Sequence, residues 1–157
     1  MEKGITNLTD VARSVQLLKI DGYSALSSTM TCSDFIRSTW NVGGYDWEVR
    51  LSTYCCNGNS WVKLKLVLLS EARVDKVRAS LSCWLVDPSG KFAPSEEKSV
   101  STSFSKTGQV SSDVALVHRG HHVWNDSITV ECTITVVKEP KNITFPAKKD
   151  MPVSAVL

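Results

Sequence analysis

The chain has 157 residues, of which 42% are hydrophobic and 22% are charged, and its formal net charge is +2. This length suits one domain with a core of its own. Because positive and negative residues are mixed along the chain, we expect neither a nucleic-acid-binding nor a membrane-surface protein. No apolar run is long enough for a signal peptide or a membrane span, which predicts a soluble intracellular chain.

Segments in which apolar and polar residues alternate recur along the first third of the chain, and this pattern predicts strands. They are residues 14–20, 34–40 and 45–51. Trp47, Val49 and Leu51 share one face of the third segment, so we expect these side chains to point into the core. The Gly43-Gly44 pair before it predicts a turn that a side chain would obstruct.

Alternation continues through the rest of the chain, in residues 61–69, 77–86, 99–105 and 127–137. Asn57-Gly58 is a strong signal for a two-residue hairpin turn before the first of these segments. About eight short strands at close spacing predict an all-β, antiparallel β-sandwich.

One segment, residues 109–122, departs from alternation and predicts a short helix. Val110, Val114 and Val117 are spaced by four and three residues, Ser111 or Ser112 is available as an N-cap, and Gly120 is a stop signal. We expect about two or three turns. After Pro140 no period is sustained, so residues 140–157 are interpreted as a linker-like tail.

Residues with catalytic or metal-binding chemistry are sparse, so we expect no enzyme, no metal and no cofactor. His118, His121 and His122 have no cysteine near them in sequence at metal-ligand spacing. The five cysteines are odd in number and show no C-x-x-C spacing, which predicts buried or half-buried free thiols. They are Cys32, Cys55, Cys56, Cys83 and Cys132.

Five stretches together resemble the MATH domain, and most closely the plant BTB/POZ–MATH proteins. They are LLKIDGYSAL (17–26), FIRSTWNVGGYDWEVRL (35–51), SWVKLKLVLLS (60–70), KVRASLSCWLVDPSG (76–90) and VWNDSITVECTITVVKE (123–139). The blocks occur in the family's order, and the Gly-Gly-Tyr-Asp-Trp core is specific. The resemblance covers roughly residues 11–139, which we take as a MATH domain after an N-terminal tail of residues 1–10.

This resemblance implies an eight-stranded antiparallel sandwich of the TRAF type, here with one short helix. Members of the family are substrate receptors of cullin-based ubiquitin ligases, which implies a cytoplasmic or nuclear protein. Their MATH domain holds short, extended, Ser/Thr-rich peptides of protein substrates in a shallow groove. The peptide pairs with a strand, so that main-chain hydrogen bonds give affinity.

The resemblance places a peptide-binding groove at Lys65, Leu81, Phe104, Lys106, Thr107, Gly108 and Gln109. A groove aromatic of the family falls on Lys65, a groove phenylalanine falls on Leu81, and the family's Trp-Gly-Phe falls on residues 107–109. Because aromatics are the usual anchors, peptides of the family type should bind weakly here. Lys65 favours an acidic or phosphorylated ligand instead. The alternative is that Lys65 extends into solvent, Leu81 packs in the core and the groove is degenerate.

No BTB segment follows the domain within these 157 residues. If the chain is complete, we expect a protein that binds substrates or full-length BTB/POZ–MATH relatives but does not itself recruit a cullin. If it is a fragment, the ligase-adaptor role applies. The alternative function is a scaffold with a degenerate groove that associates with itself or with its relatives through a sheet edge.

Overall fold

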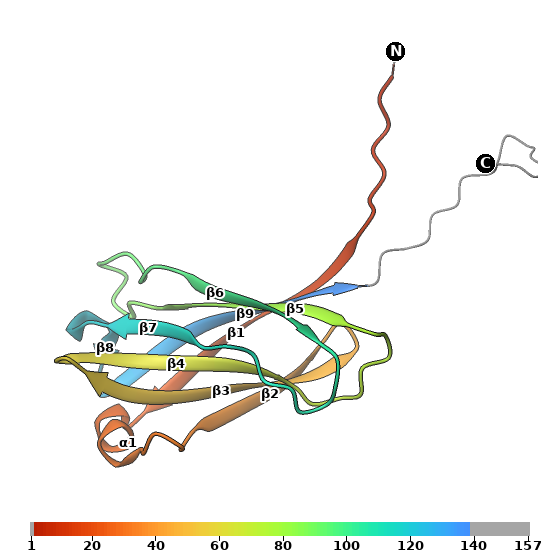
Figure 1. Ribbon diagram of the computed structural model, residues 1–157. Coiled ribbons are helices and arrows are strands. Elements are labelled where there is room, and N and C mark those ends of the chain that lie inside the picture. The colour runs from red at the N-terminus through yellow and green to blue at the C-terminus, as the bar shows by residue number, and fades with distance from the viewer. Residues whose placement is uncertain (1, 139–157) are drawn as a thin grey trace, which may run out of the picture.

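The alternating segments form strands, and these assemble into two antiparallel sheets in the computed structural model, which describes residues 2–138. Sheet 1 has the order β1 (Asp10–Asp21), β9 (Ser127–Lys138), β5 (Val77–Leu85) and β6 (Lys98–Phe104), and the short β8 (Val123–Trp124) also pairs with β9. Sheet 2 has the order β2 (Ile36–Val42), β3 (Tyr45–Cys56), β4 (Asn59–Leu68) and β7 (Val114–His118). The sheets pack face to face (Figure 1), which confirms the all-β sandwich.

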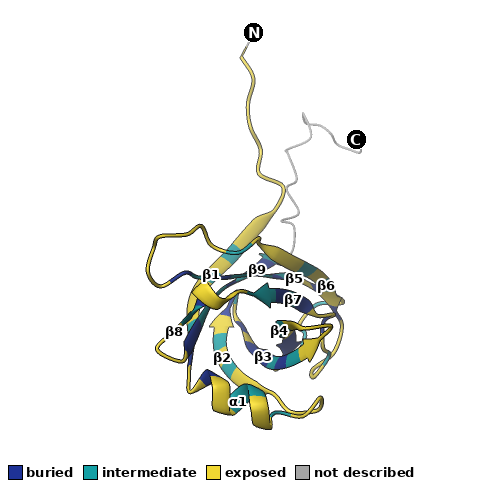
Figure 2. Cartoon of the chain, turned by 90° about the vertical axis from the view of Figure 1, so that its left-hand side faces the viewer, coloured by how far each residue is buried: buried dark blue, intermediate teal, exposed yellow. Residues whose placement is uncertain are grey.

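The core lies between the two sheets and is built by the inward-facing residues of the alternating strands. Trp47, Val49 and Leu51 are at most 2% exposed, as their shared parity predicts. The Trp47 indole N–H donates to the Val42 carbonyl at 3.1 Å, so its one polar atom is satisfied inside the core. Figure 2 shows that the buried residues lie mainly on the strands of the two sheets.

Two glycine turns fix how the strands of sheet 2 follow one another. Gly43 has φ +67°, and a Cβ built there would lie 3.1 Å from the Val136 side chain of sheet 1. Asn57 and Gly58 both have positive φ, 52° and 76°, which is the two-residue hairpin that the sequence predicts. This hairpin sets the β3–β4 register, with Tyr54 opposite Trp61.

The helix predicted over residues 109–122 is wrong, because this segment contains strand β7 and a 3-10 turn, Gly120–His122. Val114 and Leu116 are buried and pair with β4, so their period of two places them in the core. Ser111 caps no helix. Its hydroxyl accepts the Leu66 N–H at 2.9 Å and extends the pairing along β4.

Within residues 2–138 the α-helix is instead α1 (Tyr23–Thr29), and contacts distant in sequence hold it. The Asp126 carboxylate accepts the Ser24 N–H and hydroxyl, each at 2.9 Å. Tyr23 lies 2.7 Å from His118 Nε2, and burial raises the pKa of Tyr23 to about 12. Its hydroxyl therefore stays protonated and shares a hydrogen bond with the imidazole. Local sequence gives no sign of these partners.

All five cysteines lie within the described residues and are free thiols, but only Cys83 and Cys132 are buried. Cys32, Cys55 and Cys56 are exposed, so the predicted burial is wrong for these three. The first strand begins at Asp10, and the predicted tail 140–157 lies outside the described residues. Over residues 2–138, no helix is both long and apolar enough to cross a membrane.

Candidate functional site

The two sheets each end in an edge strand on the same side of the sandwich, β6 in sheet 1 and β7 in sheet 2 (Figures 1 and 2). Among residues 2–138, no strand pairs with the outer edge of β7. At the end of β6, the segment that leads on to β7 is tied back to β6. The Gln109 side chain donates to the Ser103 carbonyl at 3.1 Å and accepts the Ser105 N–H at 2.8 Å.

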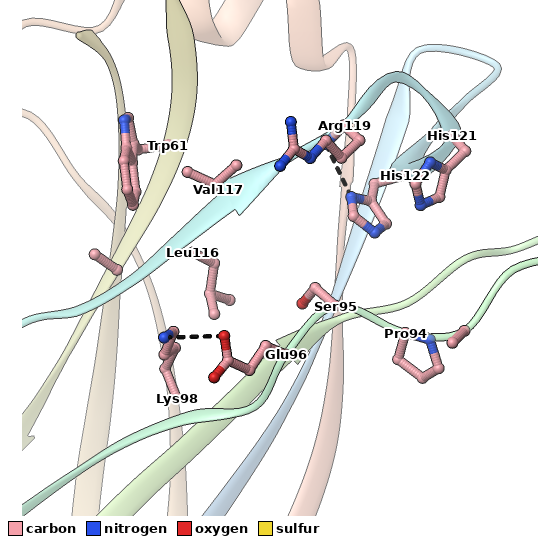
Figure 3. Close-up of a pocket in the computed structure, with 12 residues that line it drawn as sticks. Trp61, Pro94, Ser95, Glu96, Lys98, Leu116, Val117, Arg119, His121 and His122 are labelled. Atoms are coloured by element: carbon pink, nitrogen blue, oxygen red, sulfur yellow. Dashed lines mark hydrogen bonds and ion pairs between the residues drawn. The ribbon is translucent and has the colours of Figure 1, made fainter. Parts of the chain in front are cut away.

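At the opposite end the two edges separate around a hollow of about 400 Å³, which we call the edge hollow. One wall comes from β4, β7 and the turn after β7, and the other from the segment that leads into β6 (Figure 3). The lining residues labelled in the figure are Trp61, Pro94, Ser95, Glu96, Lys98, Leu116, Val117, Arg119, His121 and His122. The edge hollow therefore runs beside the free edge of β7.

Two histidines close the edge hollow at the 3-10 turn. His122 Nδ1 accepts the Arg119 main-chain N–H at 3.0 Å (Figure 3). Burial, followed by the neighbouring His121, lowers the pKa of His122. The ring is therefore neutral near pH 7 with its proton on Nε2, an atom that has no hydrogen-bond partner among the described residues.

A second hollow, of about 340 Å³, lies on the outer face of sheet 2, and we call it the basic hollow. Its floor carries Arg50 and Ser52 of β3 and Lys63 and Lys65 of β4. The loop 32–35 and Val110 form its rim.

Ion pairs and aromatic rings hold the cations of the basic hollow in place. Lys63 and Lys65 each lie 3.4 Å from one oxygen of the Asp113 carboxylate. The Arg50 guanidinium pairs with the buried Glu48 carboxylate and lies 4.5 Å from the centre of the Phe35 ring. The face therefore presents positive groups in set positions.

The structure corrects the placement of two residues that the sequence assigns to the groove. Leu81 and Phe104 are both 0% exposed, so neither presents a side chain to a peptide. Leu81 lies on the inner face of β5. The Phe104 ring packs edge-on against Trp47, with the ring centres 5.1 Å apart. Odd-numbered residues of β5 and even-numbered residues of β6 face inward, so both side chains belong to the core.

Several hydrogen-bonding groups of the segment 106–109 are already used within the fold. The Thr107 hydroxyl donates to the Ser70 carbonyl at 3.0 Å, and the Gly108 N–H donates to the Leu68 carbonyl at 2.7 Å. Gln109 ties β6 to this segment, while Lys106 is exposed. The free edge thus lies further along the chain, at β7.

Lys65 is a predicted groove residue that lies in the basic hollow, with its side chain 46% exposed. The reasoning from sequence missed its neighbours Arg50 and Lys63, as well as Trp61 and Arg119 of the edge hollow. The positions of Arg50, Lys63 and Trp61 could have been predicted from the hairpin at residues 57–58. A two-residue turn places Lys65 opposite Arg50, Lys63 opposite Ser52, and Trp61 opposite Tyr54.

Comparisons with known proteins leave the family of the chain open. No family model and no curated protein matches it. Among solved structures the chain is similar to the trimeric lipoprotein SadB of Salmonella enterica, with 16% sequence identity and a TM-score of 0.40. The match covers 75% of this chain and 60% of that chain. A likeness this weak bears on neither the family nor the function.

Proposed function

We propose that this chain is a protein-binding module that holds short extended peptides by pairing them with the outer edge of β7. The observation that carries the proposal is the free edge of β7 beside the edge hollow. An edge strand offers a row of N–H and C=O groups that a peptide in extended conformation can satisfy.

The dimensions of the edge suit a short peptide. The strand β7 has five residues, which span about 17 Å at the rise of a β-strand. Main-chain bonds along this length give affinity without reading sequence, and pockets for alternate side chains add selectivity.

The edge hollow provides such a pocket. Trp61 is half-buried in its wall, and its ring stacks on Tyr54 with the centres 6.0 Å apart. A side chain of the peptide that enters the hollow would bury apolar area against Trp61 and Leu116. A tryptophan in a pocket is a common energetic anchor of an interface.

The resemblance to plant BTB/POZ–MATH proteins supports a finer form of the proposal. In that form the bound peptides are Ser/Thr-rich segments of protein substrates, and the module serves recognition in cullin-based ubiquitination in the cytoplasm or nucleus. Full-length BTB/POZ–MATH relatives are further candidate partners. The edge strand and its hollow support peptide binding at the level of architecture alone, so the finer form rests on the sequence motifs.

A peptide array followed by fluorescence titration tests the proposal. Trp61→Ala should weaken the best peptides about tenfold or more, because it removes an aromatic anchor. Trp124→Ala is the matched control, since Trp124 is 57% exposed and lies outside the edge hollow. N-methylation of alternate peptide amides should abolish binding in one register only. Equal effects of the two tryptophan variants, or no effect of N-methylation, would contradict strand addition.

A second candidate function, self-association through a sheet edge, is favoured by the composition of β1. This strand is the other edge of sheet 1, and Val11, Val15 and Leu17 are 45%, 54% and 63% exposed on it. A long edge strand with exposed apolar residues is a template for pairing with another chain. Sedimentation should then show a dimer that Leu17→Lys dissociates. A monomer at all concentrations would exclude this candidate.

A further inference from the structure

We propose that the basic hollow is an anion-binding subsite that takes a phosphorylated serine or threonine side chain. The subsite deepens the proposed function, on which its role in peptide selection rests. Its ability to bind the phosphate group stands on its own geometry.

A row of like charges crosses sheet 2 at this point. Arg37 of β2, Arg50 of β3 and Lys65 of β4 lie directly opposite one another in register. Like charges opposite each other across strands are destabilising, and directly opposed side chains are about 5 Å apart at Cβ. A bound anion between them would reduce the repulsion that the Glu48 and Asp113 carboxylates leave. Such a row suits a charged ligand better than it suits the stability of the fold.

The ion pairs of the described residues leave this row and the adjacent Lys63 under-neutralised. Lys63 and Lys65 share the single Asp113 carboxylate, and Arg37 and Arg50 share the single Glu48 carboxylate. Four cations against two carboxylates leave a surplus of two positive charges. A phosphorylated side chain carries about −1.5 to −2 at pH 7, so it would supply negative charge that these two carboxylates do not.

One further carboxylate, Asp34, lies on the rim and reduces the surplus to one. It is engaged in its own turn, because Asp34 Oδ2 accepts the Thr31 N–H at 2.8 Å. This hydrogen bond lowers the pKa of Asp34, so the carboxylate stays charged at the edge of the hollow. Asp34 should therefore select against anions that approach over the rim.

The floor of the hollow offers donors of several kinds. Arg50 lies opposite Lys65, and Ser52 lies opposite Lys63, so the four residues form a compact square on one face. The stack of Arg50 on Phe35 and the contact of Lys63 with Tyr54, at 4.7 Å, fix the two cations. Guanidinium, ammonium and hydroxyl groups in set positions are suited to phosphate oxygens.

The subsite is within reach of a peptide on β7. Strands are about 4.8 Å apart, so a peptide beside β7 lies about 10 Å from β4. Lys63 lies opposite Ala115 of β7, and its ammonium lies 3.4 Å from Asp113, the residue directly before β7. A phosphorylated side chain of the peptide would reach from β7 toward that ammonium. A phosphopeptide can thus pair with β7 and reach the basic hollow at once.

The subsite itself is tested by NMR titration with the minimal probe N-acetyl-O-phosphothreonine amide, compared with its unphosphorylated form. Shifts should appear at residues 50–52 and 63–65 with the phosphorylated probe alone. Lys65→Gln should weaken the probe about fivefold, whereas Lys19→Gln on sheet 1 should not. Asp113→Asn should tighten it about threefold, because a competing carboxylate is removed. No shifts at these residues, or no response to Asp113→Asn, would overturn the inference.

A paired library of Ser/Thr-rich peptides separates this inference from the proposed function. Phosphorylated members should bind about tenfold more tightly than plain ones, and Lys65→Gln should remove the difference. Plain peptides that bind at β7 with no gain on phosphorylation would overturn the inference and leave the proposed function standing. A minimal probe that binds while the whole library is silent would support the subsite and refute peptide binding.

Discussion

Phe104→Ala should destabilise the fold by about 4 kcal/mol, because the Phe104 side chain belongs to the core. Phe104 is 0% exposed, and its transfer from water contributes about 2.5 kcal/mol. The cavity left behind adds about 1 kcal/mol. The lost edge-on contact with Trp47 adds about 0.5–1 kcal/mol.

Chemical denaturation measures this loss as a shift of the unfolding midpoint. Phe92→Ala is the matched control, since Phe92 is 58% exposed and its removal should cost at most about 1 kcal/mol. If the alanine variant does not fold, Phe104→Leu provides the measurement instead. Leucine keeps most of the side-chain volume, so this variant should cost no more than about 1.5 kcal/mol. A Phe104→Ala variant of nearly normal stability that no longer binds peptide would refute the core assignment and restore Phe104 to a groove.

Two other outcomes follow from backbone geometry and burial. Gly43→Ala should cost about 2 kcal/mol or more, because it adds a contact with Val136 to a positive φ, whereas Gly58→Ala, with open space around it, should cost about 1 kcal/mol. Equal losses in denaturant titrations would argue against the clash. Burial lowers the pKa of His118 and His122 below 6.5, so the unfolded state binds more protons than the fold in acid. The contribution of the two neutral histidines to the free energy of unfolding should be fully present above pH 6.5 and be lost as the pH falls below it. A melting temperature that stays constant between pH 7 and 5 would contradict this.

Period-two alternation predicted the sandwich because burial on one face of a strand leaves a local trace in the sequence. It also contained the correct placement of Leu81. In residues 77–85 every second side chain is buried, and Leu81 belongs to that set. The resemblance placed Leu81 in a groove by position, and the alternation of its own strand would have been the better guide.

The helix prediction failed for the opposite reason, since local spacing imitated a helix at a place where tertiary contacts decide. Three valines at helical spacing lie in residues 110–117, yet β4 offers unsatisfied backbone groups that this segment pairs with. The helix α1 was missed because its partner Asp126 lies about a hundred residues away. Contacts of that kind leave no pattern in the helix itself.

Of the two hollows in the candidate site, local sequence predicts one, and contacts distant in sequence determine the other. The hairpin at Asn57-Gly58 fixes a register in which Arg50 opposes Lys65, so the basic hollow could be predicted from local sequence. The edge hollow could not. It depends on how far β6 and β7 separate beyond the connecting segment that Gln109 holds against β6, and on the turn that brings Arg119 and His122 beside the segment 93–98.

Strand addition at β7 is tested most directly by amide hydrogen exchange, measured residue by residue with and without a saturating peptide from the array. Strand addition predicts that amides of residues 114–118 exchange more slowly in the complex, in an alternating pattern, because every second N–H faces the outer edge. Amides of β1 should exchange at unchanged rates. Protection confined to β1, or no protection in β7 with peptide bound, would contradict binding at this edge.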